Sequence, residues 1–396
     1  MKNLINYFVL IVLITACSAS EKMPVVMVSE TAGLDRSLEY VNSTISLGRA
    51  LAEDERLIAI DTEGGTEILV DDVHLEEIEN RFEYTIVFPI AIAANQSKTF
   101  TIKIQENNNP ASSAQQMLSK DDLAVENEFY KATFSSEDDQ RGGQVNGIVL
   151  KNFKNQLLKR GHISMHWAPN FSKSSSESYF NFEDLRPDAN HEIVGEQYSV
   201  IKERSGNTDS VPEIQISGRY EFYDKLPYFL FESTILVQKE VELNLLRNDE
   251  MTMDSLFTHI AYVKEDGTIE HLNLYSEEVD VLEENHVTDD APWLAFYHLD
   301  KGYGFGSIRL VYDNTNTKGE PSPTHHPYTK ITKSSNNGRY WNRVLSDTIQ
   351  TFPAGSQYYE KNAYLVFPVS PDSPEKVIKD YAALLNNPLT VKVVEN

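Results

Sequence analysis

A two-residue alternation of apolar and polar positions runs through much of the chain. Apolar side chains recur at every second position in the segments 82–88, 100–104, 214–222, 229–237 and 241–245. This is the period of a β-strand with one face buried. Long strands that follow one another in this way favour a large antiparallel sandwich over parallel strand–helix–strand units. The pattern therefore predicts an all-β protein.

One helix is predicted near the C-terminus. Ser373 and Pro374 are typical of a helix start, because proline at the first helical position has no N–H to leave unpaired. Val377, Tyr381 and Leu384 then recur at helical spacing. We expect this helix to lie against the β-structure through that apolar stripe.

A polar stretch, residues 106–120, divides the chain. It contains Pro110 and few apolar side chains, which is typical of a linker. We predict a small β-sandwich domain at residues 25–106 and a large antiparallel β-supersandwich at residues 120–396. Within the first domain, the acidic run 71–79 is predicted to be a loop or a short helix.

The N-terminus has the pattern of a bacterial lipoprotein signal peptide. Lys2 precedes an apolar run that ends in Ile-Thr-Ala-Cys, which predicts a signal over residues 1–16 and acylation of Cys17. The alternative is a transmembrane helix, but the run is shorter than the ~18–20 residues that a span needs. We expect residues 17–24 to form a tether. The predicted location is the outer membrane, with the protein facing the periplasm or the cell surface.

The overall charge is strongly acidic. The 396 residues include 60 Asp and Glu against 35 Lys and Arg, a net charge of −25. Neutralising phosphates requires surplus Lys and Arg, so general nucleic-acid binding is not expected. Cys17 is the only cysteine, which excludes a disulfide framework and a cysteine metal site. No cofactor is predicted.

Residues 301–343 are a cationic stretch in this acidic chain. They contain seven Lys and Arg residues and two acidic residues. Cations, imidazoles and aromatic rings together suit an anionic sugar, because rings stack on the pyranose and guanidinium groups hold a carboxylate or sulfate. The alternative is a solvated loop whose charges pair with acidic neighbours. The candidate binding residues here are His325, His326, Arg339, Trp341 and Arg343, with Tyr340 as a candidate acid or base.

Two further segments contain candidate residues. In a strand, His162 and His166 would share one face about 13 Å apart, too far to share a metal but able to line one groove beside Trp167. Arg247 and Asn248 belong to a polar run between two strand patterns, and His259 follows in an apolar strand. For each histidine, the alternative is a hydrogen-bonded structural residue.

Several catalytic motifs are missing from the sequence. The glycine–aromatic run 302–306 is not followed by Gly-Lys-Ser/Thr, so it predicts a strand approached closely by a neighbour rather than a phosphate loop. No Gly-x-Ser-x-Gly and no His-Glu-x-x-His is present, which leaves serine-hydrolase and zinc-protease chemistry without support.

Three segments resemble a known group of proteins. Residues 126–152, ENEFYKATFSSEDDQRGGQVNGIVLKN, resemble the entry strands of galactose-mutarotase-like supersandwich domains. LLRNDEMTMDSLFTHIAY and NGRYWNRV resemble segments of uronate-processing lipoproteins of Bacteroidota polysaccharide utilisation, the lyases and dehydratases acting on ulvan-type glycans. The resemblance covers about residues 126–369. It implies a carbon–oxygen lyase; unlike the larger polysaccharide lyases, the chain has no α/α-toroid.

The predicted function is β-elimination on a uronic-acid polysaccharide or oligosaccharide, as a lyase or as a dehydratase that releases water. This reaction needs cations on the carboxylate, a base near C5 and an acid at the leaving oxygen. Arg247, Asn248, Arg339 and Arg343 are the candidates for the carboxylate, and His166, His259 and Tyr340 for base and acid. Two alternatives are a non-catalytic glycan-binding lipoprotein and a glycoside hydrolase, which would need two carboxylates about 5–9.5 Å apart.

Overall fold

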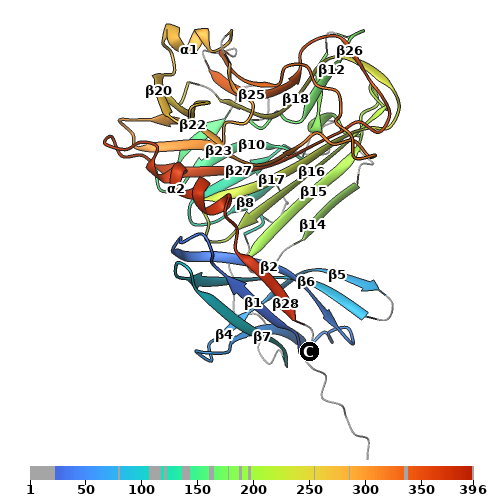
Figure 1. Cartoon of the computed structure of the whole chain (residues 1–396), viewed down its shortest axis with the longest axis vertical. Helices are drawn as coiled ribbons and strands as arrows, with labels where there is room; N and C mark the ends of the chain where they lie inside the picture. The colour runs from blue at the N-terminus through green and yellow to red at the C-terminus, as the bar shows by residue number, and fades with distance from the viewer. Residues whose placement is uncertain are drawn as a thin grey trace, which may run out of the picture.

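The protein is built almost entirely from antiparallel β-sheets (Figure 1). This computed structural model describes residues 23–78, 81–106, 117–119, 123–135, 143–159, 165–176, 178–186, 190–194, 198–253, 255–284, 286–333 and 338–394. The predicted all-β class, with a small sandwich, a large supersandwich and a C-terminal helix, is confirmed. None of the described helices is long and apolar enough to cross a bilayer.

Two sheets form the small sandwich near the N-terminus. The five-stranded sheet has the order β28 (Thr390–Val394), β1 (Val25–Ser29), β7 (Ser97–Glu106), β3 (Glu55–Asp61) and β4 (Glu67–Leu69). The three-stranded sheet has the order β2 (Arg36–Leu47), β6 (Arg81–Ile92) and β5 (Asp71–Ile78). Alternate residues of both sheets, among them Ile86, Phe88 and Phe100, fill the core between them.

The prediction for the acidic run 71–79 was wrong. Residues 71–78 are the edge strand β5, which pairs with β6 from Asp71↔Val87 to Ile78↔Arg81. Backbone pairing with a long neighbouring strand stabilises an edge strand even where its side chains are charged, and charges on an edge also oppose further pairing.

A nine-stranded sheet is the centre of the large supersandwich. Its order is β14 (Asn190–Val194), β15 (Ser199–Asn207), β16 (Ile214–Tyr223), β17 (Tyr228–Val237), β27 (Gln357–Pro368), β23 (Tyr303–Asp313), β22 (Trp293–His298), β19 (His259–Val263) and β20 (Ile269–Asn273). Its inner face is lined by aromatic residues such as Tyr220, Phe231 and Phe305.

Two smaller sheets cover that inner face. One is seven-stranded: β13 (Phe180–Asn181), β12 (Asn170–Lys173), β18 (Val241–Met253), β25 (Arg339–Ser346), β24 (Tyr328–Lys333) and β21 (Val287–Thr288), with β26 (Gln350–Phe352) paired to β18. The other consists of β11 (Gln156–Lys159), β10 (Val145–Leu150), β9 (Tyr130–Phe134) and β8 (Ala124–Glu126). Side chains from all three sheets form one continuous core.

The predicted helix is confirmed as α2 (Lys376–Leu385). It packs through Ile378 and Ala382 on the outer face of the nine-stranded sheet. Gly306 allows this contact, because a Cβ there would lie 2.5 Å from Ile378 Cδ1 and 2.7 Å from the Leu294 carbonyl oxygen. A short helix, α1 (Glu277–Val281), was not predicted.

The chain ends in the small sandwich, not in the supersandwich. After α2, strand β28 pairs with β1, from Val25↔Val394 to Ser29↔Thr390. Figure 1 shows β28 beside β1 in the small sandwich. Buried Arg36 of β2 donates to the carbonyls of Leu384 and Asn387, which fixes this return. The division of the chain into two domains near residues 106–120 stays a prediction, since 107–116 and 120 lie outside the described residues.

Candidate functional site

A β-bulge in β18 sets which side chains reach the outer face of the seven-stranded sheet, the face turned away from the core. Between Asn248 and Met251 the pairing with β25 shifts register, and Asp249 adopts the left-handed backbone conformation (φ 43°). The extra residue lets Arg247 and Glu250 project on the same face although they are three positions apart. Asn248 and Asp249 point into the core instead.

Arg247 and Glu250 form an ion pair on this outer face. Arg247 Nε lies 2.9 Å from Glu250 Oε2 and donates to Asn170 Oδ1 at 2.5 Å. Asn170 Nδ2 completes the triangle by donating to Glu250 Oε2 at 2.8 Å. The Glu250 side chain is 3% exposed and the Arg247 side chain 13%. Glu250 therefore serves to orient the guanidinium, which alone of the pair is reachable from solvent.

Tyr179 and Tyr340 contact the guanidinium, and Tyr328 lies near enough to feel its charge. The Tyr179 ring lies 5.3 Å from Arg247 Cζ and is 51% exposed. Tyr340 hydrogen-bonds to Arg247; burial, with Glu250 nearby, raises the pKa of Tyr340 even though the guanidinium opposes the shift. Tyr328 donates to Asp347 Oδ2 at 2.9 Å. At neutral pH the Tyr340 phenol is thus held in its protonated form.

His286 is stacked on Tyr328, with ring centroids 3.6 Å apart. It follows α1 and precedes β21, so it stands at the edge of the sheet. Partial burial lowers the pKa of His286, and Lys330 lowers it further. The imidazole is therefore neutral near pH 7 and able to accept a proton.

These residues lie across neighbouring strands of one sheet. Asn170 pairs with Arg247, Arg247 with Val344, and Val344 with Tyr328. We use the name outer-face cluster for the following six residues: Asn170, Arg247, Glu250, His286, Tyr328 and Tyr340. A hollow of about 550 Å3 adjoins it at Tyr179 and is otherwise lined by Ser172, Ser174, Ser175, Ser176, Asn244 and Leu245.

Two buried amides beside the cluster have unsatisfied atoms. Asn342, fully buried on β25 opposite Lys330, has no hydrogen-bond partner for either amide atom. Asn244 Oδ1, on the hollow, is likewise buried without a partner. A buried polar group without a partner costs free energy, about 1–3 kcal/mol, so these amides are suited to a polar ligand.

A buried polar network holds the bulge from below. The Asp249 carboxylate is fully buried and pairs with Arg309 Nε at 3.0 Å. The backbone N–H of Asp249 donates to Glu360 Oε2 at 2.9 Å. The Asp249 carboxylate also accepts hydrogen bonds from Ser307, Tyr312, Trp341 and Tyr364. This network ties β18 to the nine-stranded sheet directly beneath the outer-face cluster.

His166, a predicted base, is part of this interior. Its side chain is fully buried, with Nδ1 2.6 Å from the Tyr220 hydroxyl and Nε2 3.3 Å from that of Tyr364. Burial lowers the pKa of His166 to about 3. This geometry favours the structural alternative for His166. Trp167 is half-buried next to the cluster, where its backbone N–H donates to the Glu250 backbone carbonyl at 3.1 Å.

The cationic stretch does not present its arginines to solvent. β25 is a regular strand, so Arg339, Trp341 and Arg343 face away from Tyr340. Arg343 Nε and Nη2 bind the Asp289 carboxylate at 2.6 and 2.9 Å. Arg339 donates to the Leu274 carbonyl and pairs with Asp280. Both arginines are buried on the core side of β25, away from the outer face and from Tyr340, which does not fit the predicted role in holding a substrate carboxylate.

Two more predicted residues point into the core. Trp341 is fully buried and donates to Asp249 Oδ1 at 3.2 Å. Asn248 is buried and accepts from Arg343 Nη1 at 3.4 Å. Both residues support the bulge, and neither reaches the outer face.

The remaining histidines lie in different places. His259 belongs to the nine-stranded sheet, where Nδ1 contacts Thr258 Oγ1 at 2.8 Å and the ring stacks on Tyr297, so it is not part of the outer-face cluster. His325 lies 3.6 Å from Asp347, the acceptor of Tyr328, and its ring contacts that of His326 edge to face. His162 and Cys17 lie outside the described residues.

Sequence reasoning found Arg247 and Tyr340 but missed their partners. Strand alternation does not reveal Glu250, because the bulge shifts the period by one residue. Asn170 lies far away in sequence, on β12. The polar run Arg247–Glu250 was the available signal, since four polar residues within a strand pattern are typical of a bulge or turn. Among the described residues, no group of three His, Cys, Asp or Glu side chains could hold a metal ion.

Comparison with known proteins supports the fold. No protein-family model and no curated protein sequence matches the chain. The structure resembles that of an α-mannosidase from Enterococcus faecalis V583, with a TM-score of 0.53 at 11% identity over 94% of this chain and 46% of that one. It also resembles a glycosyl hydrolase family 38 protein from Enterococcus faecalis, with a TM-score of 0.52 at 11% identity over 95% and 48%. The chain thus spans about half the length of these structures.

Proposed function

We propose that this protein is a carbohydrate-active enzyme that carries out β-elimination on uronic-acid saccharides at the outer-face cluster. The observation that carries the proposal is the contact between Arg247 and Tyr340. It joins a solvent-accessible guanidinium to a protonated phenol, with aromatic rings on either side. A guanidinium binds a carboxylate through two parallel hydrogen bonds, and aromatic rings stack on a pyranose.

The reaction requires three contributions from the chain. Arg247 pairs with the uronate carboxylate and so acidifies the C5 proton by stabilising the charge that develops there. A ring nitrogen of His286, neutral at pH 7, takes that proton while the C4–O bond breaks and the C4=C5 bond forms. The Tyr340 hydroxyl gives its proton to the departing oxygen. The leaving group is a sugar hydroxyl in a lyase and water in a dehydratase.

The surroundings of the cluster fit a saccharide rather than a small free acid. The adjoining hollow is lined mostly by serine hydroxyls, and it shares Tyr179 with the guanidinium. A sugar next to the reacting uronate would lie there. We therefore favour an oligosaccharide or polysaccharide substrate of the uronate-rich, ulvan type that the sequence resemblance implies.

The glycoside-hydrolase alternative is weaker at this site. It needs two carboxylates on opposite sides of a glycosidic bond. Glu250 is committed to Arg247 and Asn170 and is almost fully buried. The two glycoside-hydrolase structures resemble this chain in fold, but at 11% identity they assign no catalytic residue here.

The test is to incubate the protein with long and short uronate saccharides and follow two signals. Elimination produces a double bond conjugated to the carboxylate, which absorbs in the ultraviolet, whereas hydrolysis produces a reducing end without that absorbance. We expect the absorbance to rise. A new reducing end without absorbance would support a hydrolase, and binding without either product would support a glycan-binding protein.

We also propose that Cys17 anchors the protein to the outer membrane through an attached lipid. The sequence pattern at residues 1–17 supports it. Expressed in a bacterial host, the Cys17→Ser variant should leave the membrane fraction and lose lipid labelling. A variant that remains lipid-labelled would contradict the anchor.

A further inference from the structure

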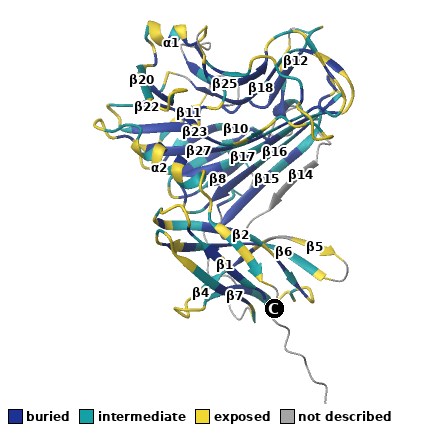
Figure 2. Cartoon of the chain, in the orientation of Figure 1, coloured by how far each residue is buried: buried dark blue, intermediate teal, exposed yellow. Residues whose placement is uncertain are grey.

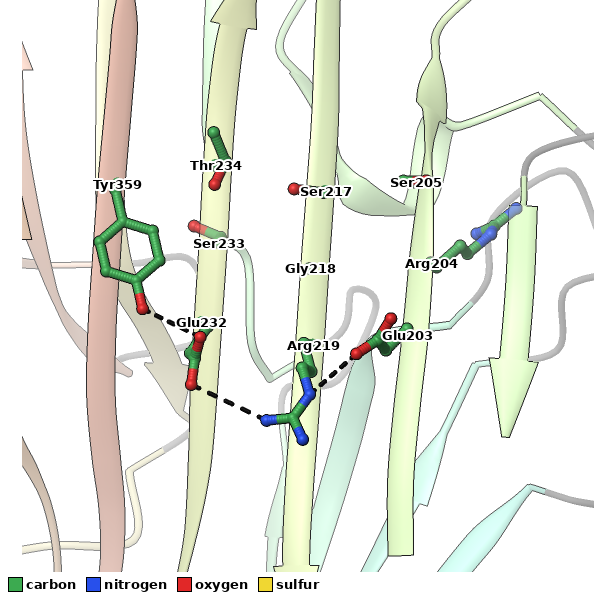
Figure 3. Close-up of a pocket in the computed structure, with 10 residues that line it drawn as sticks. All are labelled: Glu203, Arg204, Ser205, Ser217, Gly218, Arg219, Glu232, Ser233, Thr234 and Tyr359. Carbon is green, nitrogen blue, oxygen red and sulfur yellow. Dashed lines mark hydrogen bonds and ion pairs between the residues drawn. The ribbon is translucent and has the colours of Figure 1, made fainter. Parts of the chain in front are cut away.

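A second polar surface lies on the other side of the molecule, on the outer face of the nine-stranded sheet. There the strands β15, β16, β17 and β27 form the floor of a hollow of about 620 Å3 (Figure 3). α2 and the small sandwich cover a different part of this face. The hollow and the outer-face cluster belong to different sheets.

Four hydroxyl side chains cross the floor of the hollow in a single row. Ser205 pairs with Ser217, Ser217 with Thr234, and Thr234 with Tyr359. Three spacings of about 4.8 Å make this row roughly 14 Å long. Within the described part of the chain, no side chain forms a hydrogen bond to the Ser205, Ser217 or Thr234 hydroxyls. The hydroxyls of Ser205, Ser217 and Thr234 are therefore available to a ligand.

The next row consists of alternating charges that neutralise one another. In register it runs Glu203, Arg219, Glu232, Lys361. Arg219 Nε lies 2.8 Å from Glu203 and Lys361 Nζ 2.7 Å from Glu232, and the Tyr359 hydroxyl donates to Glu232 at 2.9 Å. Figure 3 shows Arg219 between the two carboxylates and Tyr359 leaning toward Glu232. The row has no net charge, and each of its groups is ion-paired.

We infer that this hollow is a second saccharide-binding site, which takes neutral sugar residues. Unpaired hydroxyls in a line, next to fixed carboxylate and guanidinium groups, offer both donors and acceptors to sugar hydroxyls. Arg219 is held by three carboxylates, Glu203, Glu221 and Glu232, which leaves it no charge to offer a uronate or sulfate. Among the described ion pairs, Arg247 of the outer-face cluster has one carboxylate partner. The row is long enough to contact several consecutive sugars.

The chemistry of the two sites is complementary. An anionic residue would be held at the outer-face cluster, while neutral residues would bind at the hollow on the opposite sheet. Because the two surfaces are built by different strands, the hollow can bind sugar whether or not the cluster carries out elimination.

The test measures binding of neutral hexasaccharides from glucan, mannan, xylan and galactan by titration calorimetry. The triple variant Ser205→Ala, Ser217→Ala, Thr234→Val should bind at least tenfold more weakly, since each lost hydrogen bond accounts for about 0.5–1.5 kcal/mol. Ser217→Tyr, which fills the row, should abolish binding. The matched control is Ser43→Ala with Thr44→Val, on strand β2, which should bind like the parent.

Two results would overturn the inference: no binding of any of the four hexasaccharides by the parent, or parental affinity in both the triple variant and Ser217→Tyr. The same variants are assayed for ultraviolet-absorbing product from a uronate oligosaccharide. Loss of neutral binding with unchanged uronate chemistry is expected. If the parent lacks uronate chemistry but binds neutral sugar, the proposed function fails and this inference stands.

Discussion

Asp249 is the single residue on which the local geometry depends most. Its left-handed backbone conformation makes the bulge, and aspartate tolerates this conformation better than most residues. Its buried carboxylate is the partner of Arg309 and of four further donors. One residue thus positions Arg247 and Glu250 above the sheet and closes the polar network below it.

Removing this carboxylate should be costly. We expect Asp249→Ala to lower the free energy of unfolding by about 3–5 kcal/mol, because Arg309 is left buried without its counter-charge. Urea unfolding measures the change. The control is Asp209→Ala, since Asp209 is 82% exposed and pairs only with Arg186 among the described ion pairs; it should change stability by less than about 1 kcal/mol. Equal effects of the two substitutions would contradict this account.

Glu360 should make stability depend on pH. Burial, with Asp249 nearby, raises the pKa of Glu360 from 4.5 to about 7 in the folded protein. Between these values the folded state binds the proton more tightly than the unfolded state, so the contribution of Glu360 is complete below pH 4.5 and is lost as the pH rises through 7.

The variant Glu360→Gln removes this titration. Its free energy of unfolding, relative to the parent, should therefore increase between pH 5 and pH 8, by on the order of 3 kcal/mol. Urea unfolding across this range gives the difference. A difference that stays flat or falls with pH would show that Glu360 does not titrate in the folded protein as described.

At the scale of elements, strand β25 shows what a local sequence pattern reveals and what it conceals. The aromatic and cationic residues from Arg339 to Arg343 cluster in sequence, but a regular strand sends them alternately to opposite faces. Tyr340 reaches the outer face, and Arg343 enters the core. The acid that neutralises Arg343, Asp289, lies more than 50 residues earlier, so the sequence pattern could not reveal that the charge is internally paired.

The packing of α2 against β23 provides a prediction for an element as a whole. Gly306→Ala should destabilise the protein by about 1–3 kcal/mol, because the new methyl group would overlap Ile378 and the Leu294 carbonyl. Thermal unfolding measures the effect. Gly64→Ala is the control, since the new methyl group would meet its nearest neighbour, Thr66 Oγ1, at 3.7 Å, an ordinary van der Waals contact. Similar melting temperatures for both variants would argue against tight packing at Gly306.

On the scale of the whole molecule, the alternation of apolar and polar residues was sufficient to predict the sheet layers. Each layer depends only on which face of a strand is apolar. The polar interior was not predictable from the sequence. Asp249 lies on β18 of the seven-stranded sheet, whereas Arg309 and Glu360 lie on β23 and β27 of the nine-stranded sheet, and the three residues meet only where the two sheets pack together. The return of the C-terminal strand to the small sandwich was also hidden, since β28 is short and half exposed (Figure 2).

That return predicts a coupling between the ends of the chain. Deleting residues 388–396 removes β28 and exposes the edge of β1, so the small sandwich should become less stable and more easily cleaved by protease. Limited proteolysis with mass spectrometry locates the cuts. We expect new cleavage within residues 25–106 while the supersandwich stays intact; an unchanged pattern would mean that β28 contributes little.

The most direct test of the central claim is the rate of ultraviolet-absorbing product from a uronate oligosaccharide with Arg247→Ala. The account predicts a loss of about 10²–10³-fold in kcat/KM, the range for removing one preorganised stabilising group. Arg247→Lys should recover only part of it, because an ammonium cannot pair with a carboxylate through two parallel hydrogen bonds. Arg186→Ala serves as the arginine control, and melting temperatures verify folding. Parental turnover by a folded Arg247→Ala variant would contradict the assignment of the site.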